Sequence, residues 1–246
     1  MLAIGGGTVL ALTAGGDDPG GDPTAGPTDG RTGDPTGDPT GDPSFLEAEA
    51  ADIVSEAEKE MSVLDSVRLS GTIESDGQPG TFDLTITSAG DCAGEVGVAG
   101  GAAELRRVDG VVYLKPDRAF FEASGELSSA EIDLVVGEIG DRWIKGDEGD
   151  SEEFEQLCDI DELLEGGSGG GDPVYAKGEV SDVDGRQAVA IDQTGGGGDV
   201  TAYVAVEDPH YLLKLEQAED EGVFTFSRFD EEFAVAAPPE DQTYTP

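Results

Sequence analysis

The chain has 246 residues, of which 55 are acidic and 13 are basic, so its formal net charge at pH 7 is −42. This charge excludes nucleic acid as a partner, because binding to phosphates requires a basic face, and an anionic membrane would also repel the chain. We expect the charge to keep the protein soluble and monomeric. Cation buffering is the alternative, although no ordered set of metal ligands accompanies the acidic residues.

Residues 1–14 are apolar and uncharged but too few to cross a bilayer as a stable helix, which is typical of the hydrophobic part of a secretion signal. No basic residue precedes them, so the true translation start could lie upstream. The small residues Ala14 and Gly15 resemble the end of a bacterial lipobox, but Gly16 stands where the lipid-bearing cysteine is required. We expect residues 1–16 to be a signal-like segment of an exported protein. It would be anchored in the cell envelope only with a lipobox cysteine, and secreted otherwise.

Residues 17–44 form a low-complexity stretch in which Gly-Asp-Pro-Thr occurs at 33–36 and again at 37–40. None of these residues has a large apolar side chain, so burial cannot offset the entropy lost on ordering the chain. We expect an extended, disordered acidic linker of the kind that separates a membrane anchor from a domain. The folded domain is expected to comprise residues 45–246.

The folded part is predicted to begin with one amphipathic helix that ends near Leu64. Ser44 can cap this helix, because Glu47 stands at the capping-box position. Apolar residues then recur at helical spacing. They are Leu46, Ala50, Ile53, Val54, Ala57, Met61 and Leu64.

After this helix the apolar residues alternate with polar ones, which predicts strands that have one wet face. Asp109-Gly110 and Asp184-Gly185 are two-residue hairpin signals. We expect roughly nine to eleven strands, mostly antiparallel because short turns join them. The clearest strand patterns lie at 67–73, 82–87, 104–108, 111–115, 174–183, 187–191, 203–206, 211–215 and 223–226.

Two helical patches, 128–139 and 151–164, interrupt the strands. A helix, a run of strands, a helical insertion and further strands indicate an α+β fold, in which helices lie on one face of a large antiparallel sheet.

Cys92 is expected on a strand and Cys158 on the second helical patch. Two cysteines in an exported chain indicate one disulfide, which would attach helix to sheet. Two separate buried thiols are the alternative.

The residue types give little support for catalysis. The single histidine, His210, follows Pro209 between two strands, where a turn residue is a better interpretation than a catalytic base. Among 55 carboxylates, a chance pair carries no information about acid–base chemistry. The segment 182–185 resembles the start of a calcium loop but lacks its later ligands, so a hairpin is favoured. We therefore expect a protein that is not an enzyme, with no metal site and no cofactor.

The order of elements is similar to that of actinobacterial lipoproteins of the LppX/LprAFG type, which are related in fold to the periplasmic carrier LolA. The resemblance covers residues 45–239. It rests on the Trp143-Ile144 segment after a helix, the turn at 184–188, the strands at 211–215 and 224–229, and the segment 235–239. It implies a strongly curved, incompletely closed sheet whose concave face is covered by helices, with an apolar cavity that holds acyl chains or lipidated partners. The chain departs from the family at Gly16 and in its cysteine pair.

The apolar faces supply candidate cavity residues, although the same residues could fill a solid core. The candidates are Ile53, Ala57, Met61, Leu84, Ile86, Leu114, Phe120, Ile132, Val135, Val136, Ile139 and Val204. The leading hypothesis is a module that binds or carries a lipid or another amphiphile. The alternative is an envelope sensor or interaction domain, which would bind a partner protein through its acidic surface or an edge strand.

Overall fold

A computed structural model describes residues 43–75, 77–125, 127–146, 157–160, 173–195, 199–217 and 222–245. The predicted signal-like segment 1–16, the linker up to residue 42, the glycine runs 166–171 and 196–198, and most of the predicted helical patch 151–164 lie outside the described residues.

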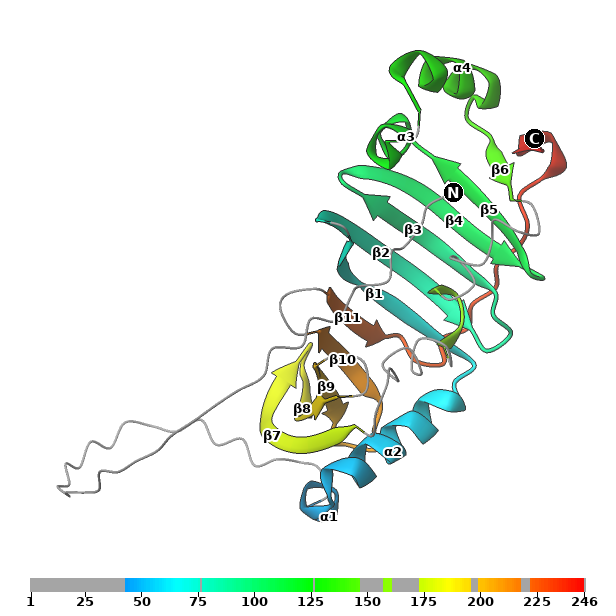
Figure 1. Ribbon diagram of the computed structural model, residues 1–246. Helices are drawn as coiled ribbons and strands as arrows, with labels where there is room; N and C mark the ends of the chain where they lie inside the picture. The colour runs from blue at the N-terminus through cyan, green and yellow to red at the C-terminus, as the bar shows by residue number, and fades with distance from the viewer. Residues whose placement is uncertain are drawn as a thin grey trace, which may run out of the picture.

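One large curved sheet of twelve strands forms the described domain, in the order β12-β6-β5-β4-β3-β2-β1-β11-β10-β9-β8-β7 (Figure 1). Every neighbouring pair is antiparallel except β12 with β6. The sheet does not close on itself, which confirms the predicted α+β open half-barrel. The strands are β1 Ser66–Ser75, β2 Gln78–Thr87, β3 Cys92–Val98, β4 Gly101–Val108, β5 Val111–Pro116, β6 Trp143–Lys145, β7 Val174–Val183, β8 Arg186–Thr194, β9 Val200–Ala205, β10 Leu212–Gln217, β11 Gly222–Ser227 and β12 Thr243–Tyr244.

The two Asp-Gly pairs form the predicted hairpin turns. Asp109 and Gly110 have φ angles of 50° and 78°, and Asp184 and Gly185 have φ angles of 50° and 84°. Positive φ at both central residues is what a two-residue hairpin of type I′ requires, and this turn matches the twist of the flanking strands.

The inner face of the sheet forms the main core. Leu69, Leu84 and Leu105 lie on this face of β1, β2 and β4, and each is fully buried. Ile53 and Met61 of the N-terminal helical segment belong to the same core cluster. Alternation along the strands therefore places these apolar side chains on one inner face, where they share a core with the buried residues of the N-terminal helical segment.

The N-terminal segment contains two helices, α1 Pro43–Glu47 and α2 Ala50–Ser62, so the prediction of one continuous helix was wrong. Lys177 of β7 donates from Nζ to the carbonyl oxygens of Leu46 (2.7 Å) and Ala48. In a continuous helix these oxygens would accept from the amides four residues later. The lysine thus stabilises the break between the two helices.

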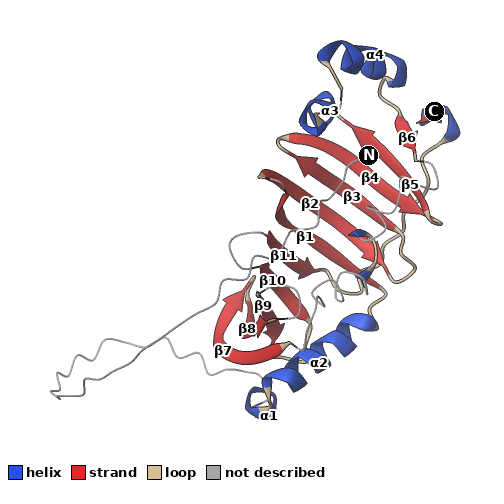
Figure 2. Cartoon of the chain, viewed as in Figure 1, coloured by secondary structure: helices blue, strands red, loops and turns tan. Residues whose placement is uncertain are grey.

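Two more helices, α3 Arg118–Ser124 and α4 Ser129–Ile139, lie beyond the β3–β5 end of the sheet, opposite α1 and α2 (Figure 2). The helix predicted at 128–139 is confirmed. Phe120, one of the candidate cavity residues, lies on α3 and not on a strand. This helix begins because the side chain of Asp117 accepts a hydrogen bond from the amide of Phe120 at 2.7 Å.

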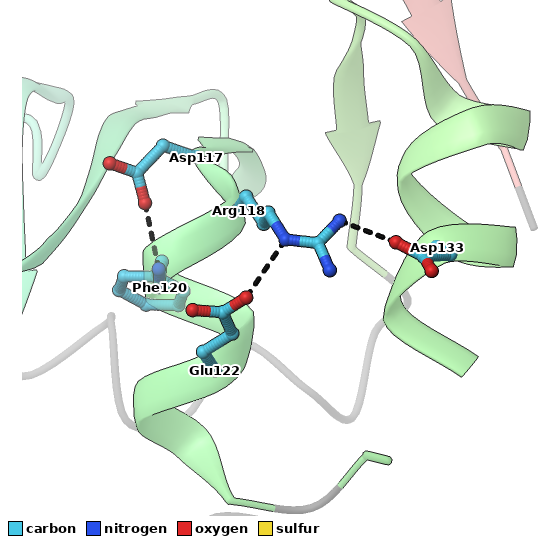
Figure 3. A network of polar contacts seen from close by, with 5 residues as sticks. All are labelled: Asp117, Arg118, Phe120, Glu122 and Asp133. Atoms are coloured by element: carbon cyan, nitrogen blue, oxygen red, sulfur yellow. Dashed lines mark hydrogen bonds and ion pairs between the residues drawn. The ribbon is translucent and has the colours of Figure 1, made fainter. Parts of the chain in front are cut away.

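Arg118 joins these two helices. Its Nε donates to Glu122 at 2.8 Å within α3, and its Nη1 donates to Asp133 of α4 at 2.6 Å (Figure 3). Helix α4 also carries a capping box between Ser128 and Glu131. The ion pair of Arg118 with Asp133 bridges the two helices, whereas the capping box stabilises the first turn of α4 itself.

Strands β6 and β12 did not stand out in the sequence. The segment after β11 returns along the sheet, and Arg106 holds it by donating to the carbonyl oxygen of Ala236 at 3.1 Å. The guanidinium of Arg106 also lies over the ring of Trp143, 4.5 Å from its centroid. At the end of the segment, Tyr244 donates to Glu138 of α4 at 3.1 Å.

Cys92 and Cys158 form a disulfide in the structure, with Cα atoms 5.6 Å apart. Both residues are fully buried, and Ile160 is 7% exposed. The bond attaches the described segment 157–160 to β3, so this segment contributes to the main core.

None of the helices in the described part of the chain has the length and apolar character needed to cross a membrane.

Candidate functional site

An apolar cavity of about 70 Å³ lies between α2 and the strands β7–β10. Three apolar side chains of α2 form one wall, and the inner face of the strands forms the other. The described residues that line the cavity are Val54, Ala57, Glu58, Met61, Tyr175, Ile191, Gln193, Ala202, Val204, Leu212 and Leu215.

Strand register builds the sheet side of the cavity. Ala202 of β9 is the register partner of both Ile191 of β8 and Leu215 of β10, so the three side chains form one row on the inner face. Val204 pairs with Leu212 in the next row. The strands are close neighbours in the sheet, so their alternating apolar residues combine into a continuous surface.

Three polar side chains form the rim of the cavity. Tyr175 of β7 and Gln193 of β8 are register partners, and Glu58 projects from α2. Glu58 is exposed as a residue, but desolvation still raises the pKa of its carboxyl, because the charged form loses part of its water. The pKa of Tyr175 is also raised, first by burial and then by the negative charge of Glu58. This end of the cavity therefore disfavours further negative charge.

The cavity is small for a ligand site. Its volume of about 70 Å³ exceeds the share of liquid volume that one water molecule occupies, about 30 Å³. Small-molecule sites usually measure about 300–1,000 Å³. Only part of an alkyl chain fits in this volume, and a longer chain would gain room if α2 moved away from the sheet.

Two contacts at the α1–α2 junction oppose this movement. Lys177 binds the carbonyl oxygens described above, and the ring of Phe45 stacks on that of His210 with centroids 3.6 Å apart. His210 also lies 3.0 Å from the carbonyl oxygen of Ala205 through Nδ1. The histidine thus packs against α1, and this position gives it a structural role.

Ala57, Met61 and Val204 are the predicted cavity residues that line this space. Ile53, Leu84 and Ile86 are buried in the same core cluster without lining the cavity, and Leu114 packs against that cluster. Phe120 lies on α3, and Ile132, Val135, Val136 and Ile139 lie on α4, at the other end of the sheet. A single ligand site formed by all twelve stays a prediction.

Sequence reasoning missed most of the strand side of the cavity and all of its polar rim. Ile191, Leu212 and Leu215 lie within segments predicted as strands, so their alternation was visible. The helical pattern of α2 does not single out Glu58. Only the strand register and the position of α2 place this carboxyl beside Tyr175.

Within the described ranges, no group of three or more His, Cys, Asp or Glu side chains is placed to hold a metal ion. Asp182 accepts a hydrogen bond from the amide of Gly185 at 3.0 Å, which stabilises the hairpin turn.

Comparison with solved structures shows that the chain shares its fold with LprF. LprF from Mycobacterium bovis matches with a TM-score of 0.50 and 14% identity, over 80% of this chain and 98% of LprF. The lipoprotein LppX from Mycobacterium tuberculosis has a TM-score of 0.49 and 16% identity, over 79% of this chain and all of LppX. The complex of MucA and MucB from Pseudomonas aeruginosa has a TM-score of 0.34 and 17% identity, over 79% of this chain and 60% of the matched chain. No protein-family model and no curated protein matches the sequence. The resemblance in fold to the LppX/LprAFG type is confirmed.

Proposed function

We propose that this domain is a non-catalytic module of the cell envelope, which binds the apolar chain of a lipid or another amphiphile beneath α2. The apolar cavity between α2 and β7–β10 carries the proposal. The fold shared with LprF supports it, as does the signal-like sequence of residues 1–16.

Binding proceeds by separation of α2 from the sheet. The buried face of α2 consists of Ile53, Ala57 and Met61, and an inserted alkyl chain replaces their contacts with the strands. Burial of each CH₂ group contributes about 0.8 kcal/mol, so a chain of several methylene groups can compensate for the contacts that α2 loses. The hydrogen bonds of Lys177 contribute to the free energy needed to separate α2 from the sheet, because they hold the α1–α2 junction to β7.

Filling the cavity tests this proposal. Ala57 faces the cavity and is 4% exposed, whereas Ala51 is exposed on the same helix. We expect Ala57→Leu to lower the affinity for the uncharged fluorescent probe N-phenyl-1-naphthylamine by about tenfold or more, which corresponds to about 1.4 kcal/mol. The affinity for dodecanol, measured by displacement of this probe, should fall by the same factor. Ala51→Leu is the matched control and should change affinity by less than about twofold.

Circular dichroism and thermal melting show whether each variant keeps the fold. An overpacked cavity can lower stability by roughly 1–3 kcal/mol without unfolding the domain. Failure of the wild-type protein to bind either compound, or equal binding by the folded Ala57→Leu variant, would overturn the proposal.

Binding of a partner protein is a second candidate function, favoured by strand β7. This strand has ten residues, eight of which are exposed, and it forms one edge of the twelve-stranded sheet. An edge of this length can pair with an extended peptide, and the acidic surface would attract a basic one. Pairing would slow hydrogen exchange of the β7 amides when a basic peptide is added, and unchanged exchange counts against this function.

A further inference from the structure

Glu58 is the single formally charged residue among the eleven described residues that line the cavity. None of these eleven is basic. A ligand that places its alkyl chain in the cavity therefore brings its head group next to one carboxylate, with the hydroxyl of Tyr175 and the amide of Gln193 nearby.

The lysines on the elements that carry this rim are engaged elsewhere. Lys59 of α2 pairs with Glu56 at 2.8 Å and lies 3.9 Å from Glu60. Lys177 of β7 donates to the carbonyl oxygens at the α1–α2 junction. Within the described part of the chain, Glu58 has no ion-pair partner among the salt bridges, so a cation from outside can occupy this position.

The environment of Glu58 favours a positive partner. Its carboxylate has lost part of its water, and an ammonium group would replace the lost solvation with a charge-assisted hydrogen bond. A carboxylate or phosphate head group would instead face a like charge in a chain whose net charge is −42.

We infer that the cavity selects amphiphiles with a cationic head group over anionic ones, and that Glu58 is the residue that makes this selection. The inference rests on the proposed function, because it assumes that an alkyl chain enters beneath α2.

Three ligands with the same alkyl chain test the inference: dodecylamine, dodecanol and dodecanoate, each used below its micelle concentration at pH 7 to displace N-phenyl-1-naphthylamine from the full chain. We expect the amine to bind at least about tenfold more tightly than the carboxylate. Glu58→Gln should weaken amine binding by about three- to tenfold, the range of a partly exposed ion pair of about 1 kcal/mol. Dodecanol, which carries no charge, is the reference ligand: the amine affinity of each variant is expressed relative to its dodecanol affinity.

Glu60→Gln is the matched control, because it removes the same charge from the same helix at a position that does not line the cavity. Repeating the measurements at about 0.5 M NaCl screens the distant charges and leaves the local contribution of Glu58. If dodecanol fails to bind, the proposed function is wrong. If dodecanol binds but the amine shows no preference, or if Glu60→Gln reduces the preference as much as Glu58→Gln, the inference is overturned and the proposed function stands.

Discussion

Removal of the Cys92–Cys158 disulfide should strongly destabilise the domain. The bond links β3 to the segment 157–160, and in a self-repelling acidic chain it limits how far the unfolded state can expand. Replacing both cysteines with alanine removes the bond and two fully buried sulfur atoms. We expect most of the loss of stability to come from the unfolded state, because the unfolded chain gains conformational entropy when the bond is removed.

The size of the loss follows from the length of the closed loop. The two cysteines are 66 positions apart, for which the chain-entropy relation gives about 4 kcal/mol. For a folded domain of about 200 residues, each kcal/mol changes Tm by roughly 2–4 °C, so Tm should decrease by roughly 8–16 °C.

Urea unfolding followed by circular dichroism measures this difference. The single variants Cys92→Ala and Cys158→Ala serve as controls, because each also removes the bond and should lose nearly as much stability as the double variant. Ellman titration of unreduced, denatured wild-type protein should find no free thiol. A stability difference below about 1 kcal/mol between wild type and the double variant would refute the entropic reasoning.

Three further predictions concern single contacts and the overall charge. Lys177→Met should lower the free energy of unfolding by about 1 kcal/mol and speed hydrogen exchange in the first turn of α2, whereas Lys59→Met should not affect that exchange. Seven of the 55 acids and one of the 13 bases precede Phe45, so the folded domain carries a net charge of −36. Salt screens the repulsion among these charges, so Tm should rise between about 0.01 and 1 M NaCl. A flat response would mean that the charges are locally compensated. The hydrogen bond to Glu216 raises the pKa of Tyr203 to about 12, so its contribution to stability is present below pH 10 and is lost as the pH rises through 12. A pH titration followed by tyrosinate absorbance should show a deprotonation step near pH 12 in the wild type and lack that step in Tyr203→Phe.

Local patterns predicted the parts of the fold that local chemistry determines. Asp109-Gly110 and Asp184-Gly185 form the expected turns, because a two-residue turn depends only on the backbone angles of the two residues themselves. The break between α1 and α2 was missed because its stabilising group, Lys177, lies 131 residues away from Leu46 in the sequence. No helical periodicity reports such a contact.

The candidate site shows the same division. Ala57 and Met61 could be predicted because helical spacing identifies the buried face of α2. Tyr175 and Gln193 could not, because their proximity depends on the register of β7 with β8. Sequence spacing also does not reveal the ion pair of Arg118 with Asp133, which bridges α3 and α4.

The return of the chain to β12 determines how the domain would respond to mechanical tension. Helix α1 lies beside the β7 edge and β12 lies at the opposite edge, so a pull between residues 43 and 245 acts across the strands (Figure 1). Strand β12 pairs with β6 through two residues, whereas β1 pairs with β2 through ten. The C-terminal segment should therefore detach first, and the molecule lengthens until the hydrogen bond of Arg106 to Ala236 resists the force. The remaining strands of the sheet are pulled only after this contact breaks.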